Sequence, residues 1–283
     1  MVRAIDIHIH PPMPGRRTLT DDPEIAKYFR SAVAHSKPEE MAEMYAELDI
    51  FGVLFQIDFE TASGSKPIPN DYIAELVQRY PKQFVGFGSV DPWKGAIAVR
   101  EAERCADELG LLGLKFHPQQ QQFYPNDQRF YPLWETAQRL GLIVLIHTGT
   151  TGVGVGQPGG GGIKLKYARP IPYIDDVAAD FPELTIIMAH PSFPWQDEQL
   201  AMLVHKPNVY MDLSGWSPKY FSPLLVQYAK TLIQDKVMFG SDYPVISPER
   251  WLNDFAGLGF NEAVTQKILI DNARKLLKLE NLP

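Results

Sequence analysis

Histidine and aspartate side chains stand at the ends of several apolar runs in this sequence. Five of the seven histidines lie there, namely His8, His10, His117, His147 and His190, and Asp242 ends a further run. A single histidine in such a place is usually a hydrogen-bonded structural residue, but burying five costs stability unless a metal or a substrate compensates. Imidazole nitrogen and carboxylate oxygen are ligands of divalent ions such as zinc. The pattern therefore indicates a metal site that activates water.

The apolar runs themselves predict the elements that position these side chains. Buried parallel strands are near-continuous apolar runs, and such runs occur near residues 4–10, 51–57, 84–90, 111–117, 142–147, 184–190, 208–213 and 236–242. The segments between them predict helices, among them 38–49, 95–110, 128–140 and 220–234. Alternating strands and helices predict an α/β fold, a (β/α)8 TIM barrel, as one domain over residues 1–283.

Two features frame this barrel. The segment 11–36 after the first strand is predicted to be an inserted loop with a short helix over 22–33, and C-terminal helices over 248–256 and 261–277 are expected to close the barrel. A doubly wound open sheet is the rival fold. It would usually carry a glycine-rich turn after the first strand, where this chain has His-Pro-Pro-Met-Pro.

The barrel brings the strand ends together, because the carboxyl ends of all eight strands meet at one mouth. His8 and His10 are two residues apart, so their side chains should share the inward face, with Asp6 one layer deeper. By the same alternation Lys115 and His117 should both reach the mouth.

Composition limits the kinds of partner. The formal net charge is −7, which argues against nucleic acid, and no run approaches the roughly 20 apolar residues of a membrane helix. Cys105 is the only cysteine, so no disulfide forms within the chain and a cytoplasmic location is expected. The expected partner is a small molecule with a carbonyl or carboxylate group.

These motifs as a set resemble the amidohydrolase superfamily. The resemblance rests on Asp6-Ile7-His8-Ile9-His10 and Gly240-Ser241-Asp242-Tyr243-Pro244, and it is closest to the branch of aminocarboxymuconate-semialdehyde decarboxylase and related lactone hydrolases. It implies a single divalent ion, zinc first and manganese second, held by His8, His10, His147 and Asp242. It also implies that His190 moves protons, that Asp242 acts as both ligand and base, and that a homodimer is possible.

The role of Lys115 stays open at this stage. Two-metal members of the superfamily often carry a carboxylated lysine or a glutamate on the fourth strand, bridging the ions. The other interpretation, which we favour, is an ammonium group that binds a substrate carboxylate, with His117 beside it.

A glycine-rich segment follows His147, between residues 149 and 162, and it lacks the Gly-Lys-Ser/Thr of a phosphate-binding loop. It is either a mobile surface loop or a lid whose Lys164 and Arg169 meet an anionic part of the substrate. Trp195 and Trp216 follow the sixth and seventh strands. They predict a mouth suited to an apolar or aromatic group.

The leading prediction of function is hydrolysis by a metal-activated water. The resemblance extends to C–C hydrolysis of an aryl β-ketoacyl-CoA or to lactone hydrolysis. The alternative is non-oxidative decarboxylation of an aromatic or unsaturated acid, which carbon dioxide release from hydroxybenzoates would distinguish. A different class is a non-catalytic metal- or ligand-binding barrel, which would bind metal tightly without turnover.

Overall fold

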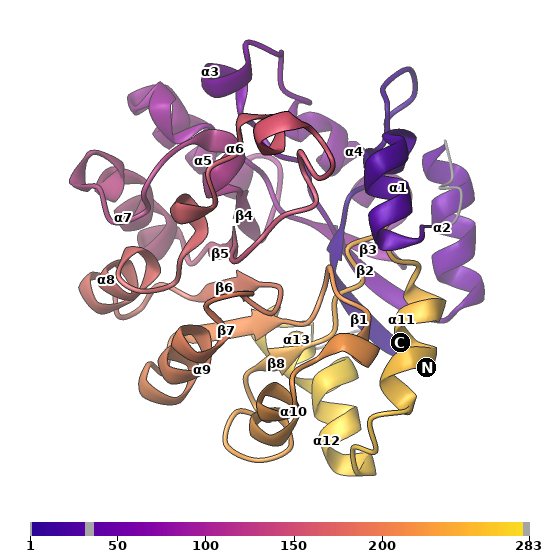
Figure 1. The fold of residues 1–283 in the computed structure, drawn as a ribbon. Coiled ribbons are helices and arrows are strands. Elements are labelled where there is room, and N and C mark those ends of the chain that lie inside the picture. The colour runs from indigo at the N-terminus through magenta and orange to yellow at the C-terminus, as the bar shows by residue number, and fades with distance from the viewer. Residues whose placement is uncertain (1, 32–36, 280–283) are drawn as a thin grey trace.

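Eight parallel strands form a closed barrel in this computed structural model, which describes residues 2–31 and 37–279 (Figure 1). They are β1 (Ala4–Ile9), β2 (Ile50–Leu54), β3 (Phe84–Gly86), β4 (Gly113–Phe116), β5 (Ile143–His147), β6 (Ile186–Ala189), β7 (Val209–Asp212) and β8 (Val237–Met238). Hydrogen-bonded neighbours follow the chain order in two groups, β1-β2-β3 and β4-β5-β6-β7-β8. The parallel bridges Gly88–Leu114 and Ile9–Tyr243 complete the ring, so the predicted barrel is confirmed.

Helices surround this barrel in the order that the sequence predicts (Figure 1). The longer ones are α2 (Pro38–Glu47), α4 (Asn70–Arg79), α5 (Ala96–Asp107), α7 (Tyr131–Leu140), α8 (Tyr173–Asp180), α9 (Gln196–His205), α10 (Pro223–Ala229) and α11 (Pro248–Ala256). Short helices α3 (Glu60–Ser63) and α6 (Pro118–Gln121) follow β2 and β4. The predicted helix 220–234 is shorter in the structure, because Ser222 caps its amino end and Pro223 fills the first turn.

The strands end earlier than the apolar runs that predicted them. Strand β8 covers only Val237 and Met238, although the apolar run continues toward residue 242. The backbone then leaves the strand conformation, and Asp242 has a φ of 64°. His10, His117, His190 and Asp242 therefore belong to loops at the mouth, whereas His8 and His147 remain in their strands. A strand prediction from hydrophobicity cannot separate these loop residues from the strand itself.

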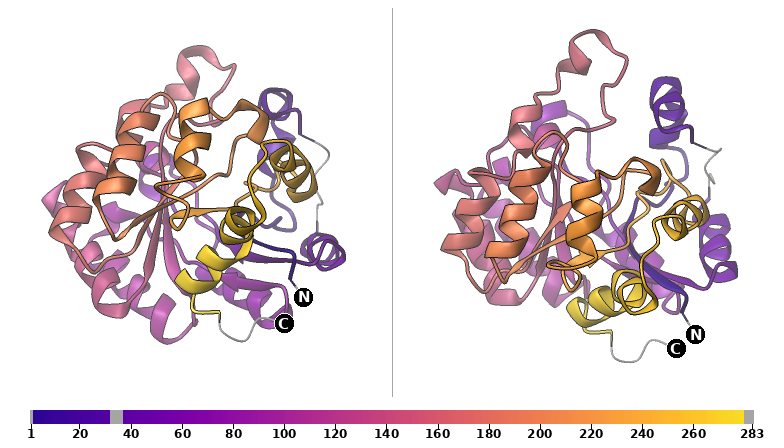
Figure 2. Two further views of the ribbon diagram at one scale, coloured as in Figure 1. Left: turned by 90° about the horizontal axis from the view of Figure 1, so that it is seen from below. Right: turned by 60° about the horizontal axis from the view of Figure 1, so that its bottom comes forward.

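The segment after β1 forms the predicted insertion at the mouth. It contains a 3-10 turn (Leu19–Asp21) and helix α1 (Pro23–Phe29), which Asp22 caps at its amino end. Arg30 ends the helix in a left-handed conformation with φ 50°, so the predicted helix 22–33 stops early. Residues 32–36 lie outside the described part of the chain. In Figure 2, α1 and the glycine-rich segment stand at the top, opposite the chain termini.

The segment 261–277 closes the opposite end of the barrel, as predicted, whereas α11, at the predicted 248–256, packs in a separate apolar cluster. Helices α12 (Glu262–Gln266) and α13 (Asn272–Leu276) flank a π-helical turn (Lys267–Asp271). Ile270, Ala273 and Leu277 pack in the interior apolar cluster with residues of β1, β2, β5, β6 and β8. The lower barrel is thus a filled core, and the upper end remains for a site.

An irregularity in β1 changes the face on which Asp6 lies. Ile5 and Ile7 pack in the interior cluster, whereas the Asp6 carboxylate meets Tyr45 of α2 and Ser241. The register between β1 and β2 shifts between Asp6 and Ile9. The prediction that Asp6 lies one layer below His8 on the same face is therefore wrong, because simple alternation fails at a bulge.

We expect Asp6→Asn to lower the free energy of unfolding by about 1–3 kcal/mol. The buried Asp6 carboxylate accepts from the backbone N–H groups of His8 (3.1 Å) and Ser241 (2.9 Å), from the Tyr45 hydroxyl (2.9 Å) and from the Ser241 hydroxyl. The side-chain amide of asparagine places an NH2 group, which is itself a donor, against these donors, so some of the hydrogen bonds are lost. Urea denaturation would measure the change. The matched control is exposed Asp107→Asn, and equal stability of the two variants would contradict the expectation.

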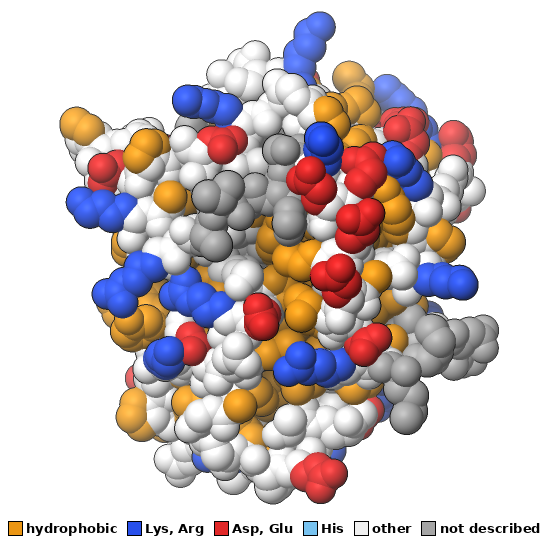
Figure 3. Space-filling model, turned by 90° about the vertical axis from the view of Figure 1, so that its right-hand side faces the viewer, with side chains coloured by type: hydrophobic (Ala, Val, Ile, Leu, Met, Phe, Trp, Pro, Cys, Tyr) orange, Lys and Arg blue, Asp and Glu red, His pale blue; other side chains and the backbone are white. Residues whose placement is uncertain are grey.

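The outer surface carries a mixture of charges. On the side with α1, α2 and α11, acidic and basic side chains lie near one another around a central group of hydrophobic ones (Figure 3). Within the described residues, every helix is too short or too polar to cross a membrane.

Candidate metal centre

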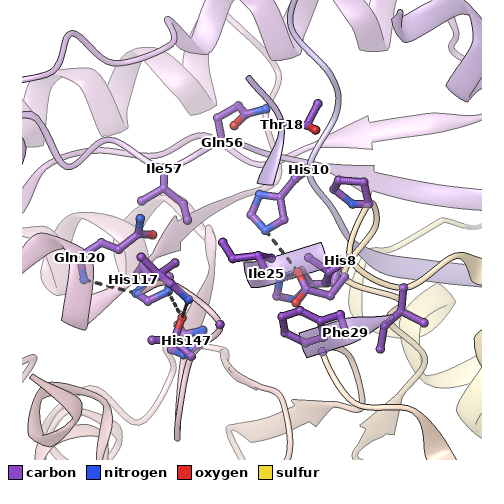
Figure 4. Close-up of a pocket in the computed structure, with 18 of the residues that line it drawn as sticks. His8, His10, Thr18, Ile25, Phe29, Gln56, Ile57, His117, Gln120 and His147 are labelled. Atoms are coloured by element: carbon purple, nitrogen blue, oxygen red, sulfur yellow. Dashed lines mark hydrogen bonds and ion pairs between the residues drawn. The ribbon is translucent and has the colours of Figure 1, made fainter. Parts of the chain in front are cut away.

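A cavity of about 500 Å³ opens at the mouth of the barrel. Its floor carries side chains from the ends of the strands, namely His8, His10, His117, His147, His190 and Asp242. Figure 4 shows how they approach: His8 and His10 come from one side of the cavity and His117 and His147 from the other. Five strand-end histidines and one aspartate, predicted from the sequence, thus meet in one place.

Asp242 stands between His8 of β1 and His10, which directly follows that strand. Its Oδ1 atom lies 3.3 Å from His8 Nε2 and 3.4 Å from His10 Nε2. His8, His190 and Asp242 each offer one ligand atom, and these atoms lie within 4.8 Å of one another. This group of nitrogen and oxygen donors matches the ligand preferences of zinc and of manganese.

His147 differs from the prediction in its orientation. Its ring lies 4.6 Å from that of His190, but its Nε2 atom faces the carbonyl oxygen of Thr150 at 3.2 Å. On its other side it stacks on His117, with ring centroids 3.9 Å apart and planes nearly parallel at 8°. The structure therefore places His147 in the cavity without bringing its Nε2 to Asp242.

Behind these side chains lies a pair of residues that the sequence reasoning missed. The Asp212 carboxylate at the end of β7 lies 3.0 Å from His8 Nδ1, and the Ser214 hydroxyl donates to it. Ser214 Oγ also lies 2.9 Å from His8 Nδ1 and 2.8 Å from His190 Nδ1. Both rings are thus held by their Nδ1 atoms, which leaves Nε2 for the cavity. An acid ending the apolar run Val-Tyr-Met-Asp was the available signal.

His117 lines the cavity, whereas Lys115 is not among the lining residues and lies against the floor residue His8. Lys115 is buried, with its Nζ atom 3.2 Å from His8 Nε2 and 4.8 Å from the centre of the Phe55 ring. Burial lowers the pKa of Lys115 to about 8. His117 caps α6 by accepting from the Gln120 backbone N–H through Nδ1. A Lys115 ammonium beside the metal-binding side chains can hold an anionic group of a substrate.

Three of the site histidines, His8, His117 and His147, are held in their neutral form. Burial and the nearby Lys115 charge lower the pKa of His8 to about 3, although Asp212 and Asp242 oppose the change. Burial also holds the pKa of His147 and His117 well below the ordinary range. Burial alone would raise the pKa of Asp242, but the His8 imidazole and its other histidine neighbours bring it below the ordinary value. Neutral imidazoles and an ionised carboxylate are the forms that bind a metal ion.

Two strained backbone positions hold the polar groups at the mouth. His190 and Asp242 have φ values of 72° and 64°, in the left-handed region that residues with a side chain rarely adopt. Gly215 packs directly against them, since a Cβ there would lie 2.6 Å from His190 Nδ1 and 3.1 Å from Asp242 Oδ2. Such strain at two converging side chains is typical of a functional site.

The remaining predicted substrate contacts divide into two groups. Trp216 lines the cavity, whereas Trp195 is half-buried outside it. Lys164 and Arg169 do not line it either: Lys164 is exposed, and Arg169 pairs with Glu198 at 2.6 Å. The expected contact of these two loop cations with a substrate therefore has no support in the geometry.

The glycine-rich segment itself reaches the cavity at its beginning. Thr150, Thr151, Gly152 and Val153 are among the lining residues. Gly152 lies against α1, because a Cβ there would stand 2.4 Å from the Phe29 ring. The segment thus meets the insertion after β1 across the mouth, which is the arrangement a lid requires.

Comparison with protein families gives one match over almost the whole chain. The model of the amidohydrolase family matches residues 5–279. A curated relative, the γ-resorcylate decarboxylase of Polaromonas sp. (strain JS666), is 24% identical over 261 residues, which are 74% of this chain and 75% of the relative.

Solved structures share the fold. An uncharacterised TIM-barrel protein of Bordetella bronchiseptica has a TM-score of 0.82 and 25% identity, and the match covers 97% of this chain and 98% of that one. A dihydroxybenzoic acid decarboxylase of Polaromonas sp. JS666, solved with manganese and 2-nitroresorcinol bound, has a TM-score of 0.66 at 20% identity, over 99% of this chain and 98% of that one.

Proposed function

Because this chain belongs to the amidohydrolase family, we propose that it is a metal-dependent decarboxylase acting without oxidation on an aromatic carboxylic acid. The observation that carries the proposal is its similarity to γ-resorcylate decarboxylase, which extends along 74% of this chain and 75% of the relative. The residues had favoured hydrolysis by an activated water, with decarboxylation second. The same donor set serves both reactions, and the relatives that are named as decarboxylases favour decarboxylation.

The donor set fits a divalent ion. Asp212 and Ser214 occupy His8 Nδ1, so that Nε2 is the nitrogen facing Asp242 and His10. When bound, the metal would polarise the carboxylate and neighbouring hydroxyl oxygens of the substrate. His8, His10 and Asp242 would hold it, with His147 the further predicted ligand. The manganese in the dihydroxybenzoic acid decarboxylase supports a divalent ion without favouring zinc.

His190 is the proposed proton donor to the ring. Ser214 receives its Nδ1–H, because the Ser214 hydroxyl proton is directed at Asp212. In its imidazolium form His190 also carries a proton on Nε2, and the ring carbon that bears the carboxylate takes that proton, which leaves His190 neutral. The bond from that carbon to the carboxylate then breaks, its electron pair returns to the ring, and carbon dioxide leaves. Burial lowers the pKa of His190, which favours giving up this proton, while Asp242 and Asp212 stabilise the charged form.

Lys115 and the walls of the cavity would orient the acid. Lys115 Nζ lies close to His8 Nε2 and would contact a carboxylate or phenolate oxygen from below. Phe29 and Trp216 are among the aromatic side chains that line the cavity and can pack on a substrate ring.

The test is carbon dioxide release from the purified protein loaded with manganese or zinc. A panel of mono- and dihydroxybenzoates would be compared with a panel of aryl esters, lactones and β-ketoacyl thioesters. We expect stoichiometric carbon dioxide and the corresponding phenol from at least one benzoate. Turnover confined to the esters, lactones or thioesters would overturn the proposal in favour of hydrolysis, and tight metal binding with no turnover would favour a binding protein.

A further inference from the structure

The outer part of the cavity is lined by basic side chains. Five of the lining residues are cationic, here called the rim cations: Arg16, Arg17, Arg30, Lys66 and Arg250. They come from the insertion after β1, from the loop after α3 and from α11. Asp242, on the floor, is the one carboxylate among the described lining residues. A chain of net charge −7 thus presents five cations and a single carboxylate in the described lining of this opening.

These cations differ in their partners from most of the other arginines of the molecule. Five arginines elsewhere are paired with an acid, in Arg79–Glu39, Arg104–Asp71, Arg129–Asp127, Arg139–Glu103 and Arg169–Glu198. Among the described residues, none of the rim cations forms an ion pair with a carboxylate. Unpaired cations around a concave opening raise the local concentration of anions there.

Two of the rim cations have structural contacts that connect the walls of the mouth. Arg250 Nη1 donates to the carbonyl oxygens of Phe29 (2.8 Å) and Arg30 (3.1 Å) at the end of α1. Arg16 Nη1 donates to the Lys66 carbonyl oxygen at 3.1 Å, which joins the insertion to the loop after α3. Arg16 keeps its other N–H groups, and Arg17 and Lys66 have their charged ends exposed at the rim. Arg16, Arg17 and Lys66 therefore remain for a ligand.

The cavity also exceeds the needs of one ring. A cavity of about 150 Å³ holds a benzene molecule, whereas this one measures about 500 Å³. Between floor and rim its walls are apolar, with Ile25, Phe29, Ile57, Phe59 and Trp216 among the lining side chains. Floor, wall and rim would suit a reacting carboxylate, an aromatic body and a second anion, in that order.

We propose that Arg16, Arg17 and Lys66 bind a second anionic group, a phosphate or a carboxylate, at the outer end of a substrate longer than a hydroxybenzoate. This assignment rests on the proposed function only for the carboxylate at the floor. The chemistry at the rim is that of guanidinium and ammonium groups facing an oxyanion. Because the rim is exposed, its contribution should weaken as salt is added.

The test compares three ligands of the metal-loaded protein by isothermal titration calorimetry. Each is a benzoate with a para substituent, ending in a phosphate, a carboxylate or a neutral hydroxyl group. We expect the two ligands that carry a second anion to bind about five- to tenfold more tightly than the neutral-ended ligand at low salt. The better of these two ligands identifies the kind of anion.

A matched pair of variants locates the effect. Arg16→Gln/Arg17→Gln should remove most of the advantage of the two ligands with a second anion, while Lys164→Gln/Lys166→Gln should retain it. Both changes take the formal net charge from −7 to −9, and the second pair lies outside the cavity lining. An equal loss in both variants, or equal binding of all three ligands by the wild type, would overturn the proposal.

A second probe separates this proposal from the proposed function. Binding of inorganic phosphate to the zinc-loaded protein would be followed by broadening of its phosphorus NMR line. Broadening by the wild type and the Lys164/Lys166 variant, but not by the Arg16/Arg17 variant, supports the rim even where no benzoate is decarboxylated. The absence of broadening by the wild type, or its persistence in the Arg16/Arg17 variant, counts against the rim.

Discussion

Replacing His190 by glutamine is expected to lower kcat for carbon dioxide release by about 100- to 10,000-fold, the usual contribution of a positioned general acid. Ser214 holds His190 Nδ1 at 2.8 Å, so that Nε2 is the atom left to carry the proton. Glutamine keeps a polar group of similar reach but has no proton to give at neutral pH. Steady-state kinetics on the best benzoate would measure the change.

The metal content of the His190→Gln protein separates proton transfer from metal binding. His190 lies within 4.8 Å of His8 and Asp242 in ligand atoms, so a role as ligand is the competing explanation. If His190 is the proton donor, the His190→Gln protein keeps its metal ion. If His190 is a metal ligand, the variant protein loses the ion. The control is exposed His205→Gln on α9, which should keep full activity. A kcat within threefold of the wild type would remove His190 from the mechanism.

Asp242→Asn is expected to reduce bound metal to less than about one tenth of an ion per chain and to lower turnover by at least about 1,000-fold. Asp242 is the charged group between His8 Nε2 and His10 Nε2, at 3.3 and 3.4 Å. Its ionised form is favoured, because the surrounding histidines outweigh its burial and lower its pKa. The neutral amide of asparagine offers the metal a single oxygen ligand, which binds more weakly than a carboxylate oxygen.

Chelation and metal return complete this experiment. The wild type, stripped by a chelator, should lose activity and regain it with manganese or zinc, whereas Asp242→Asn should not recover. Asp235→Asn is the matched control, because Asp235 is mostly exposed and pairs with Lys267. Full activity of the stripped wild type would contradict a metal-dependent reaction, and metal retained by Asp242→Asn would remove Asp242 from the ligands.

Lys115 is the group whose role these experiments constrain next. A second ion bridged by a carboxylated lysine would give two ions per chain, and a single ion leaves Lys115 as an ammonium. The structure has Lys115 Nζ at hydrogen-bonding distance from His8 Nε2, with burial lowering its pKa to about 8. Metal analysis of the wild type therefore decides between these two roles.

The sequence by itself determined the barrel and most members of the candidate centre. Continuous apolar runs specify strands that are buried on both faces, and such strands occur in parallel sheets covered by helices. Once a barrel is inferred, the carboxyl ends of its strands share one mouth. His8, His10, His117, His147, His190 and Asp242 could therefore be assigned to one cavity from their positions in those runs alone.

Tertiary structure decided everything that depends on approach between distant segments. The bulge in β1 turned Asp6 from His8 toward Tyr45, and a local irregularity of this kind has no signature in alternation. Asp212 and Ser214 became supports of His8 and His190 only because β7 lies beside β6 and β8. The rim cations gathered through three loops whose paths depend on packing rather than on local pattern. The residue types at the strand ends can be identified from the sequence alone. The orientation of those side chains and the residues that support them depend on the closure of the barrel.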